Sequence, residues 1–376
     1  MIEILQVVST LDTGGVETLL LNYYKHIDRS KFHWTFVFPA DEIRNIGMCE
    51  MPLKELGADI YTLPRRQPNF FKHLLSYYFF IMKSKHRFDI VHSHLDEMNT
   101  FYLGIAMILG IKKRISHCHV AFTKRGFFRE FVCFLAKPLL QLTCTHKFAC
   151  SYSAANFLYG NDKHVFIMKN AIDINHFKYN HIIRDNIRNK YNIDEKDVVI
   201  GCVARFFYQK NHQRLINIFS EYFKLNPYSY LVLVGNGPLE HDIRQQIDNL
   251  KLGERVIFTG LTKKVGEFLN SFDCFVLPSR FEGLGIVYIE SQVNNLHTFA
   301  TKERVPVEVK ISPYMHFISE NENDINWAKQ INETITQFKN NRKETTYFAE
   351  NAGYEISSAA GVLEKKYCSI IKNNYI

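Results

Sequence analysis

Short apolar runs alternate with longer stretches of mixed polarity along most of the chain. The apolar runs have the length of buried strands, and the stretches between them carry apolar residues at helical spacing. In the first half, the pattern predicts strands at residues 2–10, 33–39, 58–64, 88–94, 113–120, 146–154 and 164–173. It predicts helices at residues 16–27 and 99–110.

The second half repeats this plan. Its predicted strands lie at residues 198–206, 229–237, 255–260 and 273–279. Its predicted helices lie at residues 213–226, 239–253, 264–272 and 286–295. Strands that alternate with helices indicate parallel, doubly wound sheets. We therefore predict an α/β fold with two Rossmann-like domains.

The length of 376 residues also suits two domains. We expect an N-terminal domain at residues 1–170 and a C-terminal domain at residues 171–354, with a linker within residues 170–186. The last part of the chain, residues 355–376, reads as a long helix that packs back on the N-terminal domain. Two facing domains of this kind are expected to bind their ligand in a cleft, at the carboxyl ends of the strands.

Composition narrows the class of partner. The net charge of +8 favours anionic partners, but the basic residues form no long block, which argues against a nucleic-acid partner. Eight cysteines without a C-x-x-C pair indicate buried free thiols in a reducing compartment. The N-terminus reads as a strand rather than a signal peptide, and no apolar run reaches about 18 residues, so we expect no transmembrane helix.

Glycines and cations follow two of the predicted strands. Gly14 and Gly15 come after the first strand and before a helix, which is a generic anion site, although a plain turn is the commoner cause. A G-x-G-x-x-G pattern is absent, so a nicotinamide dinucleotide is not supported. Arg205 and Lys210 follow the first strand of the second half, where both could bind one diphosphate or could be two solvated loop charges.

The segment "RFEGLGIVYIE" carries two acids, Glu282 and Glu290, in an otherwise apolar setting. A rise of ~1.5 Å per helical residue puts the two carboxylates on the order of 10 Å apart, wider than the ~5–9.5 Å between paired glycosidase acids. This spacing suits acids that bind different parts of one elongated ligand. The backbone amides of Leu284 to Ile286, which include Gly285, would begin a helix and could bind phosphate. Alternatively, Glu282 is a surface loop acid and Glu290 only offsets the helix dipole.

Two histidine pairs end two strands of the first half. His92 and His94 share one face of a strand, and so do His117 and His119, because side chains alternate along a strand. No nearby cysteine or acid has metal-ligand spacing, so we predict no metal site. A hydrogen-bonding or proton-handling histidine at the cleft is the favoured interpretation, with plain packing expected for at least two of the four.

Together these residues resemble one family, the retaining nucleotide-sugar-dependent glycosyltransferases of the GT-B fold, family four, of the bacterial capsular and exopolysaccharide type. The resemblance covers nearly the whole chain. The matching segments, in the family's order, are "STLDTGGVETLLLN", "RISHCHVAF", "VARFFYQKNH", "LVGNGPLE", "VIFTGL" and "LPSRFEGLGIVYIESQ". The combination of R-x4-K with a later E-x7-E pair is its most specific part.

The resemblance implies roles for the candidate residues. Arg205 and Lys210 would bind the donor diphosphate, Glu282 the sugar hydroxyls and Glu290 the ribose. The remaining implied positions are the amides of Leu284, Gly285 and Ile286 on a phosphate, Gly14 and Gly15 near the phosphates or the acceptor, His119 near the donor sugar, and residues 259–264 near the base. The N-terminal domain would bind the acceptor and the C-terminal domain the donor.

The implied reaction moves a hexose or N-acetylhexosamine, by default from a UDP-sugar, to a glycan or lipid-linked oligosaccharide. Catalysis would include Glu282, His119, Arg205 and Lys210. No D-x-D motif occurs, so we expect a metal-independent reaction with no cofactor besides the nucleotide sugar. Two alternatives are a nucleotide-sugar epimerase of similar fold and a non-catalytic scaffold partner, against which the intact set of cations and acids argues.

The chain departs from the family's usual sequence at two places. It reads "NAID" where the family usually has "NGID", and Asn295 stands where the family commonly has a glycine turn. We expect Asn295 to replace that glycine, because Asn tolerates the left-handed conformation.

Residues 69–87 and 122–140 combine aromatic and basic residues. They suit peripheral binding to an anionic membrane surface at the inner face of the cytoplasmic membrane, or helices packed on the first sheet.

Overall fold

The computed structural model describes residues 1–12, 14–41, 46–84, 87–120, 136–338, 342 and 345–372. The chain divides into two compact units. The first unit comprises Met1–Ile172 and Gly353–Ile376, and the second comprises Asp173–Ala352. The sequence pattern put these boundaries after residues 170 and 354.

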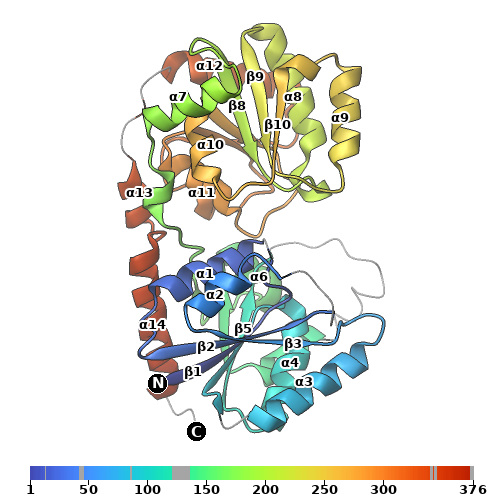
Figure 1. The fold of residues 1–376 in the computed structure, drawn as a ribbon, viewed down its shortest axis with the longest axis vertical. Coiled ribbons are helices and arrows are strands. Elements are labelled where there is room, and N and C mark those ends of the chain that lie inside the picture. Colours follow the sequence, from blue (N-terminus) through green and yellow to red (C-terminus); the bar gives the residue numbers. More distant parts are fainter. Residues whose placement is uncertain are drawn as a thin grey trace. The chain divides into compact units, whose positions relative to one another are not determined.

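The first unit is built on one parallel sheet of seven strands among the described residues (Figure 1). The strands are β1 (Ile2–Val7), β2 (Phe32–Pro39), β3 (Asp59–Leu63), β4 (Ile90–Ser93), β5 (Lys113–Cys118), β6 (His146–Ala149) and β7 (Phe166–Ile167). They are ordered β3-β2-β1-β4-β5-β6-β7. This is the α/β arrangement that the sequence predicts.

Helices cover the first sheet. They include α1 (Gly15–His26), α2 (Glu50–Glu55), α3 (Phe70–Ser84), α4 (Asn99–Ile108), α6 (Tyr152–Tyr159) and α14 (Ile356–Lys372). Figure 1 shows α14, in red, alongside α1, and the two helices are in contact. Tyr367 of α14 is fully buried and packs edge-on against Trp34 of β2, which stacks on Tyr24 of α1. Aromatic packing thus fixes the C-terminal helix to this unit.

The second unit repeats the plan with six parallel strands in its described part. The strands are β8 (Val198–Val203), β9 (Ser229–Val234), β10 (Val256–Gly260), β11 (Cys274–Leu277), β12 (His297–Thr301) and β13 (Met315–Ile318), ordered β10-β9-β8-β11-β12-β13. The helices are α7 (His181–Lys190), α8 (His212–Leu225), α9 (Glu240–Asn249), α10 (Val265–Ser271), α11 (Ile286–Val293), α12 (Asp324–Phe338) and α13 (Thr346–Asn351). The sequence pattern had offered no prediction for β12, β13, α12 or α13.

The strand order decides where ligands can bind. In both units the order reverses next to the first strand, between β1 and β4 and between β8 and β11. Chains leave the sheet in opposite directions at such a switch point, which opens a crevice at the carboxyl ends of the strands. The loops that follow these four strands carry most of the candidate residues.

Three sequence predictions about the junction between the halves were wrong in part. The predicted strand at 146–154 stops at Ala149, because the side chain of Ser151 accepts a hydrogen bond from the amide of Ala154 and caps α6. The predicted strand at 164–173 contains only the two residues of β7.

The predicted linker at 170–186 is largely structured. It contains a 3₁₀ turn (Ile174–Phe177) and the start of α7, which the Asn180 side chain caps. Arg184 and Arg188 of α7 each place an Nη2 atom 2.6 Å from a carboxylate oxygen of Asp273. These ion pairs attach α7 to the start of β11, so most of the segment belongs to the second unit.

The cysteines and hydropathy agree with the expectations. All seven cysteines in the described ranges are free, and all but Cys368 are buried. Within the same ranges, no helix has both the length and the apolar character that a membrane span requires.

Two turns of the second unit need left-handed backbone. Asn295, after α11, has φ of +60°, which confirms the prediction that asparagine takes this conformation here. Gly285, before α11, has φ of +83°, and a Cβ added there would lie 2.7 Å from the ring of Tyr288. Both sterics and dihedral angle therefore require glycine at the start of α11.

Replacing Gly285 with alanine should destabilise the second unit by about 1–3 kcal/mol, because the new Cβ is strained and meets the Tyr288 ring. Calorimetric unfolding of the full chain measures this loss. Gly361→Ala is the matched control, since this helical glycine of α14 has open space around it, and alanine there should stabilise by ~0.5–1 kcal/mol. Equal effects of the two substitutions would contradict the steric argument.

Candidate functional site

A cavity of about 430 Å³ opens at the carboxyl end of β8. Its lining residues are Arg205, Phe207, Tyr208, Gln209, Lys210 and Phe281. The two cations predicted to bind one ligand thus line one cavity, as the diphosphate interpretation requires. Arg205 is exposed and lies over the Phe207 ring, 4.7 Å from its centroid, which holds the guanidinium at the cavity wall.

Lys210 and Glu282 form an ion pair inside this site. The Lys210 ammonium lies 2.7 Å from Glu282 Oε1, and the Glu282 residue is only 5% exposed. The Ser279 hydroxyl donates to the same carboxylate oxygen at 2.6 Å, and the Gln209 amide donates to Oε2 at 3.1 Å. Glu282 is therefore a buried, held acid, and the alternative of a surface loop acid is wrong.

Sequence reasoning missed two of these partners. Ser279 and Gln209 hold the Glu282 carboxylate, yet neither belongs to a charge pattern. Gln209 precedes Lys210 in the 3₁₀ turn Tyr208–Lys210, and Ser279 lies on the loop after β11. The sequence offered one signal for them. Gln209 and Ser279 stand close to the predicted cation Lys210 and the predicted acid Glu282, after two of the predicted strands.

Close backbone contact supports the loop that carries the two cations. A Cβ at Gly235 would lie 2.2 Å from the Ala204 carbonyl oxygen, and one at Gly237 would lie 2.6 Å from the Phe206 carbonyl oxygen. The amide of Phe206 also donates to the Asn236 carbonyl at 2.8 Å. The two glycines thus let the loop after β9 pack against the loop of Arg205.

The start of α11 presents free backbone donors. Within the described part of the chain, the amides of Leu284, Gly285 and Ile286 donate to no protein group. Gly285 caps the helix without a side chain that could accept these bonds. A helix N-terminus of this kind can bind an anion through amide hydrogen bonds and the helix dipole.

Glu290 lies about one helical turn farther along α11. It keeps some exposed surface, yet protein atoms surround the carboxyl group closely enough to raise its pKa to about 7 by desolvation. No hydrogen bond to its carboxyl group occurs among the described residues. A desolvated carboxyl group without a partner is suited to accept hydrogen bonds from ligand hydroxyls.

The first unit holds the remaining predicted positions. Gly14 caps α1 in an extended conformation with φ of −153°, and Gly15 begins the helix. Neither has a left-handed backbone, so no positive φ requires glycine at these two positions. A Cβ at Gly14 would instead lie 2.1 Å from Glu17 Oε2, so glycine leaves room for the buried Glu17 side chain.

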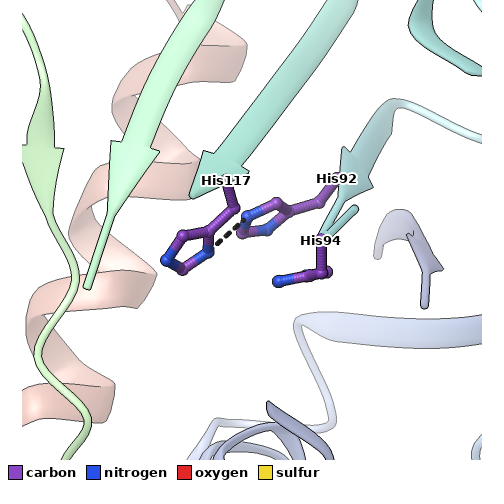
Figure 2. Close-up of side chains that lie close together, drawn as sticks. All are labelled: His92, His94 and His117. Atoms are coloured by element: carbon purple, nitrogen blue, oxygen red, sulfur yellow. Dashed lines mark hydrogen bonds between the residues drawn. The ribbon is translucent and has the colours of Figure 1, made fainter. Parts of the chain in front are cut away.

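The four histidines cluster at the carboxyl ends of β4 and β5. His92 and His117 are hydrogen-bonded through Nε2 and Nδ1 at 3.1 Å, and Figure 2 shows this bond with His94 beside it. His94 Nδ1 lies 2.9 Å from His119 Nε2. As predicted, each i, i+2 pair shares a face, with stacked rings 4.2 Å and 4.0 Å apart.

Hydrogen-bond pairing argues for hydrogen bonding rather than metal binding in this cluster. Nitrogen atoms of His92, His94 and His117 lie within 4.8 Å of one another. However, both ring nitrogens of His92 and of His94 already have hydrogen-bond partners in the protein: the Tyr367 hydroxyl and His117 for His92, and His119 and Gln6 for His94. His92 and His117 lie at only 14° and meet edge to edge, as a hydrogen bond requires.

The network also fixes the protonation of His119. Burial lowers the pKa of His119 to about 3 and the pKa of His94 well below its ordinary value, so both rings are neutral at pH 7. Gln6 Oε1 lies 2.8 Å from His94 Nε2 and can only accept, so His94 donates there and accepts at Nδ1. His119 therefore donates from Nε2, and its Nδ1 carries the lone pair.

Residues 183–353 match the family described as Glycosyl transferases group 1. The protein named as glycosyltransferase EpsF of Bacillus subtilis (strain 168) is 29% identical over 304 residues, which cover 78% of this chain and 77% of that protein. The chain is a glycosyltransferase.

One further sequence relative and one solved structure are similar to this glycosyltransferase. The Escherichia coli UDP-Gal:alpha-D-GlcNAc-diphosphoundecaprenol alpha-1,3-galactosyltransferase is 27% identical over 239 residues, which cover 60% of each chain. Anabaena Alr3699/HepE in complex with UDP matches 98% of this chain and 100% of its own with a TM-score of 0.78, at 17% identity. The glycosyltransferase thus has the GT-B fold, with two Rossmann-like units as predicted.

Proposed function

We propose that the protein is a retaining transferase that moves a hexose or N-acetylhexosamine from a UDP-sugar to a glycan or lipid-linked oligosaccharide. The observation that carries this proposal is the cavity of the second unit, where Arg205 and Lys210 lie beside the held acid Glu282. The UDP bound to HepE and the UDP-galactose named for the Escherichia coli relative support a uridine nucleotide as donor.

Each residue of the second unit has a role in this proposal. Arg205 and Lys210 bind the donor diphosphate, with help from the amides at the start of α11. Glu282 accepts hydrogen bonds from the sugar hydroxyls while Ser279 and Gln209 hold it. Glu290 accepts hydrogen bonds from the ribose hydroxyls. The loop 259–264 lies near the base in this scheme.

The chemistry follows from where charge develops. When the bond from the anomeric carbon to the phosphate oxygen breaks, its electron pair stays on the diphosphate. The Lys210 ammonium and the Arg205 guanidinium stabilise this charge in the transition state, so no metal is needed. The acceptor hydroxyl forms the new bond to the anomeric carbon on the same face, and its proton passes to the leaving phosphate oxygen.

The first unit supplies the acceptor side in this proposal, with Gly14 and Gly15 near the phosphates or the acceptor. His119 contributes a neutral imidazole near the donor sugar, because its pKa is about 3. Its Nδ1 lone pair can accept a hydrogen bond from a sugar hydroxyl, and the chain from Gln6 through His94 keeps it in that tautomer.

The pathway we propose is polysaccharide assembly, in capsule, exopolysaccharide or O-antigen synthesis. Among the relatives are a Salmonella typhi Vi polysaccharide biosynthesis protein and an Escherichia coli O-antigen glycosyltransferase. The proposed location is the cytoplasm, with peripheral attachment to the inner face of the cytoplasmic membrane.

Incubation with radiolabelled nucleotide sugars tests the proposed reaction. A transferase should consume one donor with nucleotide release, by slow hydrolysis alone and faster with a glycan acceptor. An epimerised nucleotide sugar would instead identify an epimerase. Recovery of every donor unchanged would favour the alternative of a non-catalytic scaffold partner.

Membrane attachment has its own test. Helix α3, within the predicted stretch 69–87, exposes Phe71, Leu75, Phe79 and Met82 on one side, with Phe71 83% exposed. Most of the second stretch, 122–140, lies outside the described residues. We expect the protein to sediment with anionic vesicles, and less of it to sediment as the salt concentration increases, because charge contributes to binding. The double variant Phe71→Ser/Phe79→Ser should also bind less, because apolar area contributes as well. Absence of binding at low salt would contradict attachment.

A further inference from the structure

The C-terminal helix α14 contributes a hydroxyl group to the buried polar network beneath the histidine pairs. The Tyr367 hydroxyl lies 2.8 Å from His92 Nδ1, and the Gln6 side-chain nitrogen donates to the same hydroxyl at 3.5 Å. Tyr367, Gln6 and His92 have no exposed surface. Water therefore does not reach these groups, and each depends on its protein neighbours for hydrogen bonds.

A first route from Tyr367 to His119 consists of hydrogen bonds. Gln6 Oε1 lies 2.8 Å from His94 Nε2, and His94 Nδ1 lies 2.9 Å from His119 Nε2. Because the nitrogen end of the Gln6 amide donates to Tyr367, its oxygen end faces His94. This orientation of the amide is the one that leaves the lone pair of His119 on Nδ1.

A second route consists of one hydrogen bond and one ring stack. His92 Nε2 lies 3.1 Å from His117 Nδ1, so the Tyr367 hydroxyl also holds the ring of His117 through His92. The His117 and His119 rings stack at 28°, with their centroids 4.0 Å apart. The stack supports the plane of the His119 ring, while the first route sets its tautomer.

His119 is the end of both routes. It is partly exposed, whereas the other three histidines are buried. We propose that Tyr367 is a positioning residue for sugar transfer, whose hydroxyl selects the tautomer of His119 through Gln6 and His94. Tyr367 lies outside the segment 183–353 that matches the family. The inference rests on the proposed transferase function and on the role of His119 in it.

The variant Tyr367→Phe removes the hydroxyl and keeps the ring. Among the described residues the Gln6 nitrogen donates only to this hydroxyl, so the variant leaves a buried donor without an acceptor. An amide turned by half a rotation would donate to His94 and leave only its oxygen unpaired, and an unpaired oxygen is tolerated better than an unpaired N–H group. His94 would then donate to His119 Nε2, and the proton of His119 would move to Nδ1.

NMR measures this tautomer directly. Long-range ¹H–¹⁵N spectra of the full-length protein with ¹⁵N-labelled histidine distinguish a protonated ring nitrogen from a bare one, and the His119 signals are those lost in His119→Gln. At pH 7 the wild type should carry the proton on Nε2. Tyr367→Phe should carry it mainly on Nδ1.

The rate of transfer should follow the tautomer. A protonated Nδ1 cannot accept the hydrogen bond of a sugar hydroxyl, so kcat of Tyr367→Phe should fall about 2- to 10-fold, the usual worth of one hydrogen bond. The affinity for UDP should not change, because UDP lacks the sugar that is transferred. Donor turnover and UDP titration of the same preparations measure the two quantities.

Tyr159→Phe is the matched control. Tyr159 is buried in the same unit, and its hydroxyl lies 2.8 Å from the Ser116 carbonyl oxygen, outside both routes. This control should lose stability but keep the wild-type His119 signals and kcat. If Tyr367→Phe does not fold, Gln6→Leu decides the test. It removes the acceptor for His94 Nε2 and should move the His119 proton in the same direction.

The outcomes separate this inference from the proposed function. Wild-type His119 signals in Tyr367→Phe and Gln6→Leu, or an equal loss of kcat in Tyr159→Phe, would overturn the inference even if the wild-type protein transfers sugar. A wild-type protein that consumes no nucleotide sugar would instead reject the transferase proposal together with this role of Tyr367.

Discussion

Replacement of Lys210 with alanine is expected to lower sugar transfer by about 100-fold or more. Lys210 lies in the cavity of the second unit and, in our proposal, stabilises the charge that develops on the leaving diphosphate. Removal of one fixed charge stabiliser from an active site typically costs ~10²–10³ in rate. Steady-state kinetics with a radiolabelled donor and a saturating acceptor measure the loss.

The ion pair between Lys210 and Glu282 gives this experiment an internal check. Lys210→Ala leaves the buried Glu282 carboxylate without its cation, so the thermal stability should also fall. Adding Glu282→Gln should recover stability, because the amide needs no counter-charge, while transfer stays low. Lys224→Ala, which breaks an exposed pair with Glu221, is the control. If the double variant recovered both stability and transfer, the role of Lys210 would be structural only, which would contradict the proposal.

Replacement of Glu290 with glutamine is expected to change stability and nucleotide affinity in opposite directions. The folded-state pKa of Glu290 is about 7, above its ordinary value of 4.5, so the folded protein holds a proton that the unfolded chain releases. The contribution of Glu290 to the free energy of unfolding is therefore fully present below about pH 4.5. It decreases as the pH rises from 4.5 to 7 and stays reduced above pH 7. The loss is on the order of 3 kcal/mol.

Glutamine carries no charge to desolvate. Glu290→Gln should therefore unfold at a higher temperature than the wild type at pH 8, and the difference should shrink toward pH 5. UDP affinity should fall at pH 8, because the amide is a weaker acceptor for the ribose hydroxyls. Glu333→Gln removes an exposed acid of α12 and is the control. A variant that is less stable at pH 8, or that binds UDP as tightly, would contradict these roles.

Residues that act through local geometry were predictable from the sequence. The alternation of apolar runs located β1 to β5 and β8 to β11, because the apolar residues that mark each run belong to the strand itself. Arg205 and Lys210 could be paired because they lie on one short loop. Asn295 could be assigned a left-handed turn because that preference belongs to the residue itself.

Residues that act through contacts between distant segments were not predictable. Ser279 and Gln209 meet at Glu282 only because the loops after β8 and β11 flank one switch point. The strand predicted at 146–154 failed because a single side-chain cap at Ser151 outweighs β-propensity.

The most direct test of the central claim is a crystal structure of the full-length protein with UDP. We predict that the diphosphate contacts Arg205, Lys210 and the amides at the start of α11, and that the ribose hydroxyls hydrogen-bond to Glu290. UDP bound away from these residues, or no UDP density at saturating concentration, would contradict the assignment of the second unit as the donor site.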